Sequence, residues 1–188
     1  AMIKDNTILD VFRNFPREKF LEDKYKPLSY SDNNIKINAN RYLISPLNYA
    51  KILQAAEIKS KEVVLLVGAG FGYETLILSK IAGTVVALEE ENRFFNESEK
   101  FLKEYELDNV INVKGEHELG YAKHAPYDSI IFLGSTNQVK SIFFDQLALK
   151  GKLLVCQTIN DDIDEGKLYF FYNFKNNLVK KELFDLNL

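Results

Sequence analysis

Apolar residues change their spacing along the chain, and the change occurs near Lys61. Before it, apolar side chains recur at helical spacing over residues 8–15 and again over residues 46–58, and Pro16 ends the first of these two predicted helices. The segment between them, 17–44, shows neither helical nor alternating spacing and contains the polar run "SYSDNN". We expect it to form an irregular, loop-rich extension over the mouth of a site.

After this point, short apolar runs alternate with longer segments of helical period. The short runs predict strands over 63–67, 84–88, 110–113, 129–133 and 152–156. The longer segments predict helices over 73–82, 92–105 and 139–149. Such alternation is typical of a parallel sheet with crossover helices. Two final runs, "KLYFFYNF" and "LVKKELFDL", predict a closing antiparallel hairpin.

Together these elements predict one α/β domain with a Rossmann-like architecture, in which a mostly parallel sheet carries helices on both faces. Within residues 1–188 we expect an N-terminal helical and loop extension (1–60), a ligand-binding α/β core (61–156) and the C-terminal hairpin (157–188). The length of 188 residues fits one domain, and no stretch has the composition of a linker between two.

Composition and charge limit the classes of partner. Hydrophobic residues make up 46% of the chain and charged residues 27%, which is typical of a globular domain, and a net charge of −3 provides no basic surface for nucleic acid. The single cysteine, Cys156, cannot form an internal disulfide, and no pair of His or Cys has metal-ligand spacing. No signal peptide or membrane-length apolar run is visible. We therefore expect a cytoplasmic monomer or weak homodimer that binds no metal, nucleic acid or membrane.

The stretch "VVLLVGAGFGYETLILSKIAGTVVALEEE" carries the first chemical signal. Gly68, Gly70 and Gly72 fall in the turn between the first core strand and its helix, where glycines let backbone approach a ligand. The spacing is G-x-G-x-G, with Tyr73 at the position where the dinucleotide fingerprint has its third glycine. This favours S-adenosylmethionine over NAD. We expect Ala69 and Tyr73 to contact the cofactor with the glycines.

An acid follows the second core strand. Glu89 lies about twenty residues after the first glycine, where a carboxylate accepts hydrogen bonds from both hydroxyls of a ribose. Glu90 comes next and is a further candidate contact. An ordinary strand-to-helix turn followed by an acidic helix N-terminus would also explain these residues. Their combination in one strand–turn–helix–strand unit favours the nucleoside site.

Several ordered motifs resemble one family. "GAGFGYETLILSKIAGTVVALEE", "NVINVKGEHELGY", "APYDSIIFLGS" and "FFDQLALKGKLLV" resemble the protein L-isoaspartyl methyltransferases, and "FPREKF" and "LSYSDNNIKI" resemble that family's N-terminal segments. The resemblance implies a class I, S-adenosylmethionine-dependent methyltransferase that esterifies isoaspartyl carboxylates in damaged proteins and so begins their repair. It also implies that Gly115 and Glu116 border the adenine, with the Glu116 carboxylate accepting from its amino group.

Two positions depart from the family pattern. Leu66 stands where these enzymes usually carry an acid that helps to hold the methionine ammonium. In "RYLISP", Arg41, Tyr42 and Ile44 stand at the family's Gln, Thr and Ser positions, and Ser45 restores a hydroxyl only with a one-residue slip. "RYLISP" and "ALEEE" are similar to an alphaproteobacterial, family-like branch with an altered substrate motif.

The candidate catalytic residues are Ser45, Arg41 and Tyr42. The Arg41 guanidinium would hold an acidic acceptor by a bidentate contact, with Tyr42 as the opposite wall. A carboxylate acceptor is ionised at neutral pH and needs no general base, so we interpret His117 and His124 as surface-loop residues.

Three functions remain open at this point. The first is methylation of isoaspartyl proteins. The second is methylation of another carboxylate or a small molecule. The third is a non-catalytic binding protein that keeps the methyltransferase fold.

Overall fold

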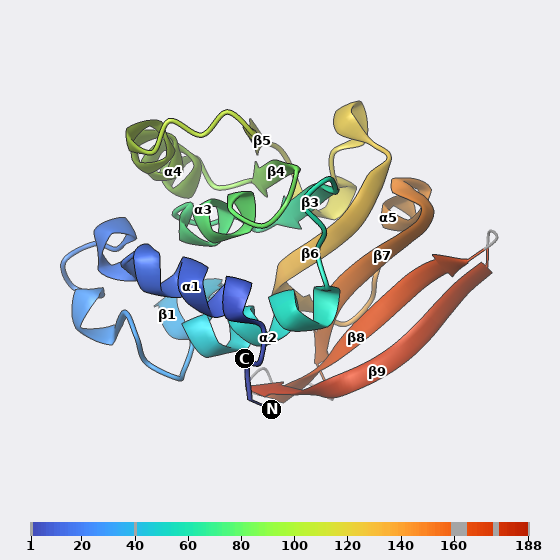
Figure 1. The fold of residues 1–188 in the computed structure, drawn as a ribbon, viewed down its shortest axis with the longest axis horizontal. Coiled ribbons are helices and arrows are strands. Elements are labelled where there is room, and N and C mark those ends of the chain that lie inside the picture. Colours follow the sequence, from blue (N-terminus) through green and yellow to red (C-terminus); the bar gives the residue numbers. More distant parts are fainter. Residues whose placement is uncertain (1, 40, 159–164, 175–176, 188) are drawn as a thin grey trace.

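A computed structural model describes residues 2–39, 41–158, 165–174 and 177–187 (Figure 1). Seven strands form the main sheet in the order β5-β4-β3-β6-β7-β8-β9. They are β3 (Val63–Val67), β4 (Thr84–Glu89), β5 (Val110–Lys114), β6 (Tyr127–Thr136), β7 (Leu147–Thr158), β8 (Glu165–Phe174) and β9 (Asn177–Asn187).

The direction of the strands follows the prediction. Neighbours from β5 to β7 pair in parallel, whereas β8 pairs antiparallel with β7 and β9 antiparallel with β8. The predicted parallel sheet with a closing hairpin is therefore confirmed. Figure 1 shows β8 and β9 as two long strands at one edge of the sheet. Residues 159–164, 175–176 and 188 of the predicted hairpin segment lie outside the described residues.

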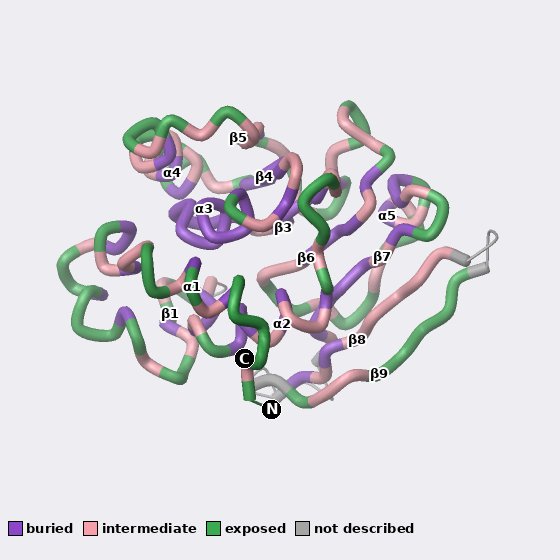
Figure 2. Tube along the Cα trace, viewed as in Figure 1, coloured by how far each residue is buried: buried purple, intermediate pink, exposed green. Residues whose placement is uncertain are grey.

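Alternation along the buried strands divides the core in two. Val64 and Leu66 pack in one apolar cluster and Leu65 and Val67 in the other, because successive side chains point to opposite faces of a strand. Helices α1 (Asn6–Asn14), α2 (Pro46–Ala56), α3 (Tyr73–Ser79) and α4 (Asn92–Glu104) contribute to the first cluster, and the short helix α5 (Ser141–Asp145) to the second. Helix α3 is buried along its whole length (Figure 2).

The segment predicted to be irregular contains a small antiparallel sheet, so the prediction was wrong there. Strand β1 (Ile35–Asn38) pairs with β2 (Arg41–Leu43), with Ile35 opposite Leu43. Both of these side chains are buried beside Phe71 and Phe94. Strands of four and three residues are too short to show a period in the sequence, and contact with distant aromatic rings stabilises them. This hairpin positions Arg41 and Tyr42. Two 3₁₀ turns precede it, Arg17–Phe20 and Lys26–Leu28.

The helix predicted over 139–149 was too long. The observed helix α5 covers Ser141–Asp145, and β7 begins at Leu147, which pairs with Tyr127 of β6. The N–H of Tyr127 donates to the carbonyl of Gln146 at 2.8 Å, so pairing with β6 begins where helical spacing still continues in the sequence. Short apolar segments of this kind fit both periods, and strand pairing decides between them. Two further 3₁₀ turns, His117–Leu119 and Ala122–His124, connect β5 to β6.

Candidate active site

A cavity of about 970 Å³ lies at the carboxyl ends of β3 and β6 and is covered by the β1–β2 hairpin. Ligands of open parallel sheets bind at this end of the strands, and the volume suits a small-molecule site. The cavity is lined by Asn34, Asn38, Ala39, Arg41, Tyr42, Ile44, Val67, Gly68, Glu90, Glu91, His117, Glu118, Phe132, Leu133, Gly134, Ser135, Thr136, Gln138, Val139, Lys140 and Phe143.

The glycine loop turns sharply from β3 into α3. Gly68, Gly70 and Gly72 have φ angles of 83°, 60° and 96°, a left-handed conformation that strongly favours glycine. The N–H groups of Gly68 and Ala69 donate to the carbonyl of Leu88 at 3.0 and 3.1 Å, which fixes the loop against the end of β4. Gly68 lines the cavity, whereas Gly72 faces α4, where an added Cβ would lie 3.1 Å from Cβ of Ser98.

Glu89 is the anchor of this loop. Its side chain is fully buried, and its carboxylate accepts from the N–H of Gly70 at 2.8 Å and from the N–H groups of Glu90 and Glu91 at 3.0 Å each. The guanidinium of Arg41 is its fourth donor. Burial alone raises the pKa of Glu89, but the imidazole of His117 beside Oε1, the charge of Arg41 and the N–H of Glu91 outweigh burial and hold the pKa below 4.5. Glu89 is therefore an ionised, oriented acceptor at neutral pH.

Arg41 reaches this carboxylate from the hairpin. Its side chain is 13% exposed, and its guanidinium lies 4.9 Å from the centre of the buried Phe94 ring. Cβ atoms added at Gly68 and Gly70 would lie 3.9 Å from its terminal nitrogens. The guanidinium therefore lies beside the glycine loop, in the space that a side chain there would face.

His117 also belongs to this group, although the sequence suggested a surface loop. Its Nε2 lies 3.5 Å from Oε1 of Glu89, and its Nδ1 lies 3.4 Å from Oε1 of Glu90. The N–H of His117 donates to Glu90 at 3.0 Å, and the N–H of Gly115 donates to the carbonyl of Glu89 at 3.1 Å. The sequence signal was its place just after β5, since parallel strands bring their carboxyl ends to one edge of the sheet.

A model of the family described as Protein-L-isoaspartate(D-aspartate) O-methyltransferase (PCMT) matches residues 1–171. This chain belongs to that family. Membership confirms the enzyme class predicted from the sequence, an S-adenosylmethionine-dependent methyltransferase.

Relatives of known name agree with the family. The protein-L-isoaspartate O-methyltransferase of Protochlamydia amoebophila (strain UWE25) is 31% identical over 153 residues, which cover 81% of this chain and 73% of that protein. A solved structure named protein-L-isoaspartate O-methyltransferase superposes with a TM-score of 0.84 at 23% identity and covers 97% of this chain, which spans 60% of the solved chain. A protein-L-isoaspartate O-methyltransferase of Plasmodium falciparum, solved in complex with S-adenosyl-L-homocysteine, has a TM-score of 0.81 at 22% identity over 98% of this chain and 89% of its own. The predicted class I fold is therefore confirmed, and the similarity to an alphaproteobacterial branch stays a prediction.

Not every residue expected in a PCMT cofactor site lies on the cavity. Tyr73 is buried and packs against Phe12 and Phe20, and its hydroxyl donates to the carbonyl of Phe15 at 3.2 Å. Its place next to the glycine loop suggested a cofactor contact, but the first turn of α3 directs its ring into the core. Its ring therefore does not line the cavity, and a cofactor contact of Tyr73 stays a prediction.

Ser45 does not line the cavity either. It is fully buried, its hydroxyl accepts from the N–H of Asn48 at 3.2 Å, and its own N–H donates to Asn34 at 2.7 Å. These contacts make it the N-cap of α2, where serine is a preferred residue, and it does not line the cavity. The neighbouring Ile44 and Tyr42 line the wall instead.

The predicted acids, and the residue that departs from the PCMT pattern in β3, also differ in whether they line the cavity. Glu90 lines the cavity, whereas the exposed Glu116 does not. An added Cβ at Gly115 would lie 3.1 Å from Leu88, so this glycine serves close packing. Leu66, in place of the usual acid, is fully buried in the core between its pairing partners Ala87 and Ile131.

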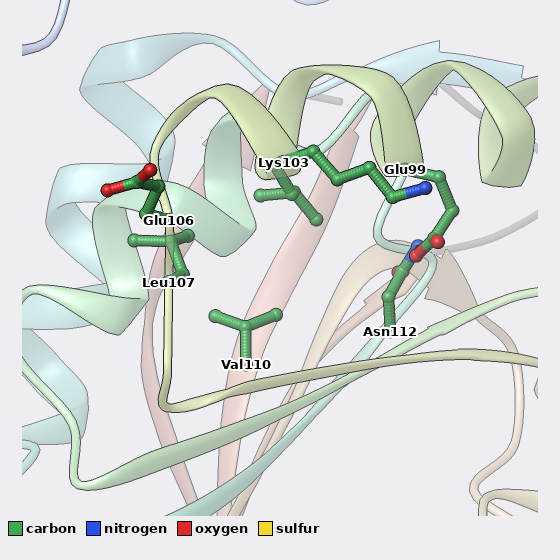
Figure 3. Close-up of a pocket in the computed structure, with 7 residues that line it drawn as sticks. Glu99, Lys103, Glu106, Leu107, Val110 and Asn112 are labelled. Atoms are coloured by element: carbon green, nitrogen blue, oxygen red, sulfur yellow. The ribbon is translucent and has the colours of Figure 1, made fainter.

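A second hollow of about 300 Å³ lies between α4 and the start of β5 (Figure 3). Three of its polar side chains lie near one another, those of Glu99, Lys103 and Asn112. The side-chain amide of Asn112 donates to the carboxylate of Glu99 at 2.8 Å. It opens at the opposite end of β5 from the glycine loop, so the larger cavity is the candidate site.

In the described ranges, no helix is long and apolar enough to cross a membrane. Among the same residues, no three or more His, Cys, Asp or Glu side chains are arranged to hold a metal ion.

Proposed function

We propose that this chain transfers the methyl group of S-adenosylmethionine to the side-chain carboxylate of an isoaspartyl residue in a protein or peptide. The observation that carries the proposal is the environment of Glu89. A buried, ionised carboxylate is oriented by loop N–H groups at the end of β4, beside a glycine turn on the cavity wall. This environment suits a ribose diol. Family membership supplies the acceptor class.

The cofactor side of the cavity is assigned to the glycine loop and the residues after β4. Gly68, Ala69 and Gly70 allow close approach of backbone to the ligand, and Gly72 fixes the turn against α4. Glu89 is buried directly behind Glu90 and His117, which line the cavity, and would accept from the ribose once Oε2 is uncovered. Bound S-adenosylmethionine supplies an electrophilic methyl group on a positively charged sulfur.

Methyl transfer to a carboxylate depends on alignment of the two reactants more than on proton transfer by the protein. A carboxylate with an ordinary pKa near about 4 is ionised at neutral pH, so its oxygen attacks the methyl carbon without a general base. The new O–C bond forms as the C–S bond breaks, and the bonding electrons return to sulfur. Ile44, Phe132 and Leu133 line the cavity with apolar surface that excludes water from this step.

The acceptor side is assigned to Arg41 and Tyr42 of the β1–β2 hairpin. The cavity presents Ile44 where the family has a serine, and a guanidinium where it has Gln. Recognition of the acceptor therefore depends on charge, through a bidentate guanidinium–carboxylate contact, more than on hydroxyl groups. We expect the enzyme to act in the cytoplasm as a monomer or weak homodimer, in keeping with its single cysteine.

The test uses methyl-labelled S-adenosylmethionine with an isoaspartyl peptide and its aspartyl isomer. We expect a base-labile methyl ester on the isoaspartyl peptide only, and a loss of about 10- to 100-fold in kcat/KM for Glu89→Gln. Glu99→Gln, in the second hollow, is the matched control and should keep the wild-type rate. Labelling of both peptides, or of neither, contradicts the proposal; labelling of a small carboxylate instead supports the alternative acceptor class.

A further inference from the structure

Arg41 lies where the cofactor's ribose is expected. Its guanidinium lies beside the glycine loop and donates a hydrogen bond to the carboxylate assigned to the ribose diol. Arg41 also lines the same cavity as Gly68 and Glu90. The residue assigned to the acceptor therefore contacts the residue assigned to the cofactor.

The hydrogen bonds at Glu89 leave no free position for a ribose hydroxyl. A carboxylate accepts about four hydrogen bonds, two at each oxygen. Oε2 accepts from the N–H of Gly70 and from Arg41, and Oε1 accepts from the N–H groups of Glu90 and Glu91. Of these four donors, which all belong to described residues, three are backbone N–H groups, one in the glycine loop and two directly after β4. Arg41 is the donor that a side-chain rotation removes.

Displacing Arg41 has a cost that a second ligand offsets. In the structure the guanidinium is 13% exposed and lies over the ring of Phe94, so it leaves both a carboxylate and an aromatic contact. A ribose hydroxyl replaces its hydrogen bond to Glu89 but carries no charge. A displaced guanidinium inside the cavity then lacks an anion, and the acceptor carboxylate supplies one.

We propose that Arg41 and the ribose of S-adenosylmethionine compete for Glu89, and that the displaced guanidinium then binds the carboxylate of the methyl acceptor. The proposal rests on the proposed function and adds an order of binding, cofactor first and acceptor second. Methylation turns the acceptor carboxylate into a neutral ester, which removes its charge pairing with Arg41. The ester leaves, and Arg41 returns to Glu89 as S-adenosylhomocysteine dissociates.

The first test is a calorimetric titration with S-adenosylhomocysteine and with 5′-methylthioadenosine, which carries the ribose but no amino-acid part. Removal of a competing charged hydrogen bond should tighten binding of both ligands by about 10-fold in Arg41→Ala. Arg41→Met is measured in parallel because it keeps an apolar stem over Phe94. Arg93→Ala is the control, since Arg93 lies over the same ring at 5.8 Å but pairs with Glu22, and its affinities should not change.

Whether the affinity for the two ligands rises or falls in the Arg41 variants decides the first half of the proposal, the competition for Glu89. Unchanged or weaker binding of both ligands in Arg41→Ala and Arg41→Met overturns the competition. Weaker S-adenosylhomocysteine binding with unchanged 5′-methylthioadenosine binding also overturns it, because Arg41 would then hold the methionine carboxylate. Failure of S-adenosylhomocysteine to bind any of the proteins overturns the competition together with the proposed cofactor site.

The second test titrates the isoaspartyl peptide with and without saturating S-adenosylhomocysteine. We expect at least about 10-fold tighter peptide binding with it in the wild type, and no such gain in Arg41→Met. Equal peptide affinity under both conditions overturns the coupling, even where methyl transfer to the peptide still supports the proposed function. A gain in cofactor affinity without any methylation of the peptide supports the competition and contradicts the proposed acceptor.

Discussion

Arg17 and Glu74 form a buried ion pair that joins the N-terminal segment to the helix after the glycine loop. Nη2 of Arg17 lies 3.2 Å from Oε1 of Glu74, and their side chains are 1% and 6% exposed. The same nitrogen donates to the carbonyl of Ile44 at 2.6 Å, and Nη1 donates to the carbonyl of Ser29 at 3.4 Å. One guanidinium thus connects α3 to the chain that leads into the active-site cavity.

Breaking this pair from one side should destabilise the protein strongly. Arg17→Met leaves the Glu74 carboxylate buried without its partner, which costs about 3–5 kcal/mol in the free energy of unfolding, whereas Arg17→Met with Glu74→Leu should recover part of the loss. Urea denaturation measures both. Arg13→Ala removes the exposed pair with Asp10 and is the control, with no measurable change expected. Equal stability of Arg17→Met and wild type would show that the Arg17–Glu74 ion pair does not stabilise the fold.

Glu89 should make stability depend on pH in the acid range. Its pKa in the folded protein is held below 4.5, so it contributes stability that is fully present above the unfolded pKa and is lost as pH falls through the lower folded value. The difference in unfolding free energy between wild type and Glu89→Gln should therefore be constant between about pH 6 and pH 8 and narrow below about pH 4. Urea denaturation across this range measures it. A difference that grows as the pH falls would contradict the sign of the pKa shift.

Ser45→Ala should affect stability without affecting catalysis. Loss of the N-cap of α2 costs about 1 kcal/mol, and Ser45→Gly should cost less because glycine is a better N-cap than alanine. Since the hydroxyl does not line the cavity, kcat with the isoaspartyl peptide should stay within about twofold of wild type. Thermal unfolding and steady-state kinetics are measured on the same preparations. A fall of about 100-fold in kcat with unchanged stability would restore a catalytic role for Ser45.

Cys156 should be inert in the folded protein. Burial near the end of β7 raises the pKa of its thiol to about 12, so the reactive thiolate is almost absent at pH 8. A chromogenic disulfide reagent should therefore release no colour from the native protein and one equivalent in urea, since the chain has one cysteine. Rapid reaction of the native protein at the rate of a free thiol would contradict this burial.

Local signals were sufficient for the sheet and the glycine turn. The apolar runs from Val63 onward predicted the parallel strands because the central strands β3 and β4 are buried on both faces, and burial selects apolar residues whatever the neighbours are. The left-handed angles at Gly68, Gly70 and Gly72 require a residue without a side chain, so the loop was visible as a motif. Glu89 was predicted from its distance to that loop, because a fixed strand–turn–helix–strand unit brings both ends together.

Contacts between distant segments were decided only by the tertiary structure. The β1–β2 hairpin has too few residues to show a period, and it forms because Ile35 and Leu43 pack on Phe71 and Phe94. This packing brings Arg41 to Glu89, forty-eight positions away, and the fold brings His117 to the same carboxylate. Spacing along the chain was therefore enough to predict the enzyme family, the sheet and the place of Glu89 at the end of β4. The tertiary structure decided which charges meet at that acid, because partners of a buried charge are set by packing in three dimensions.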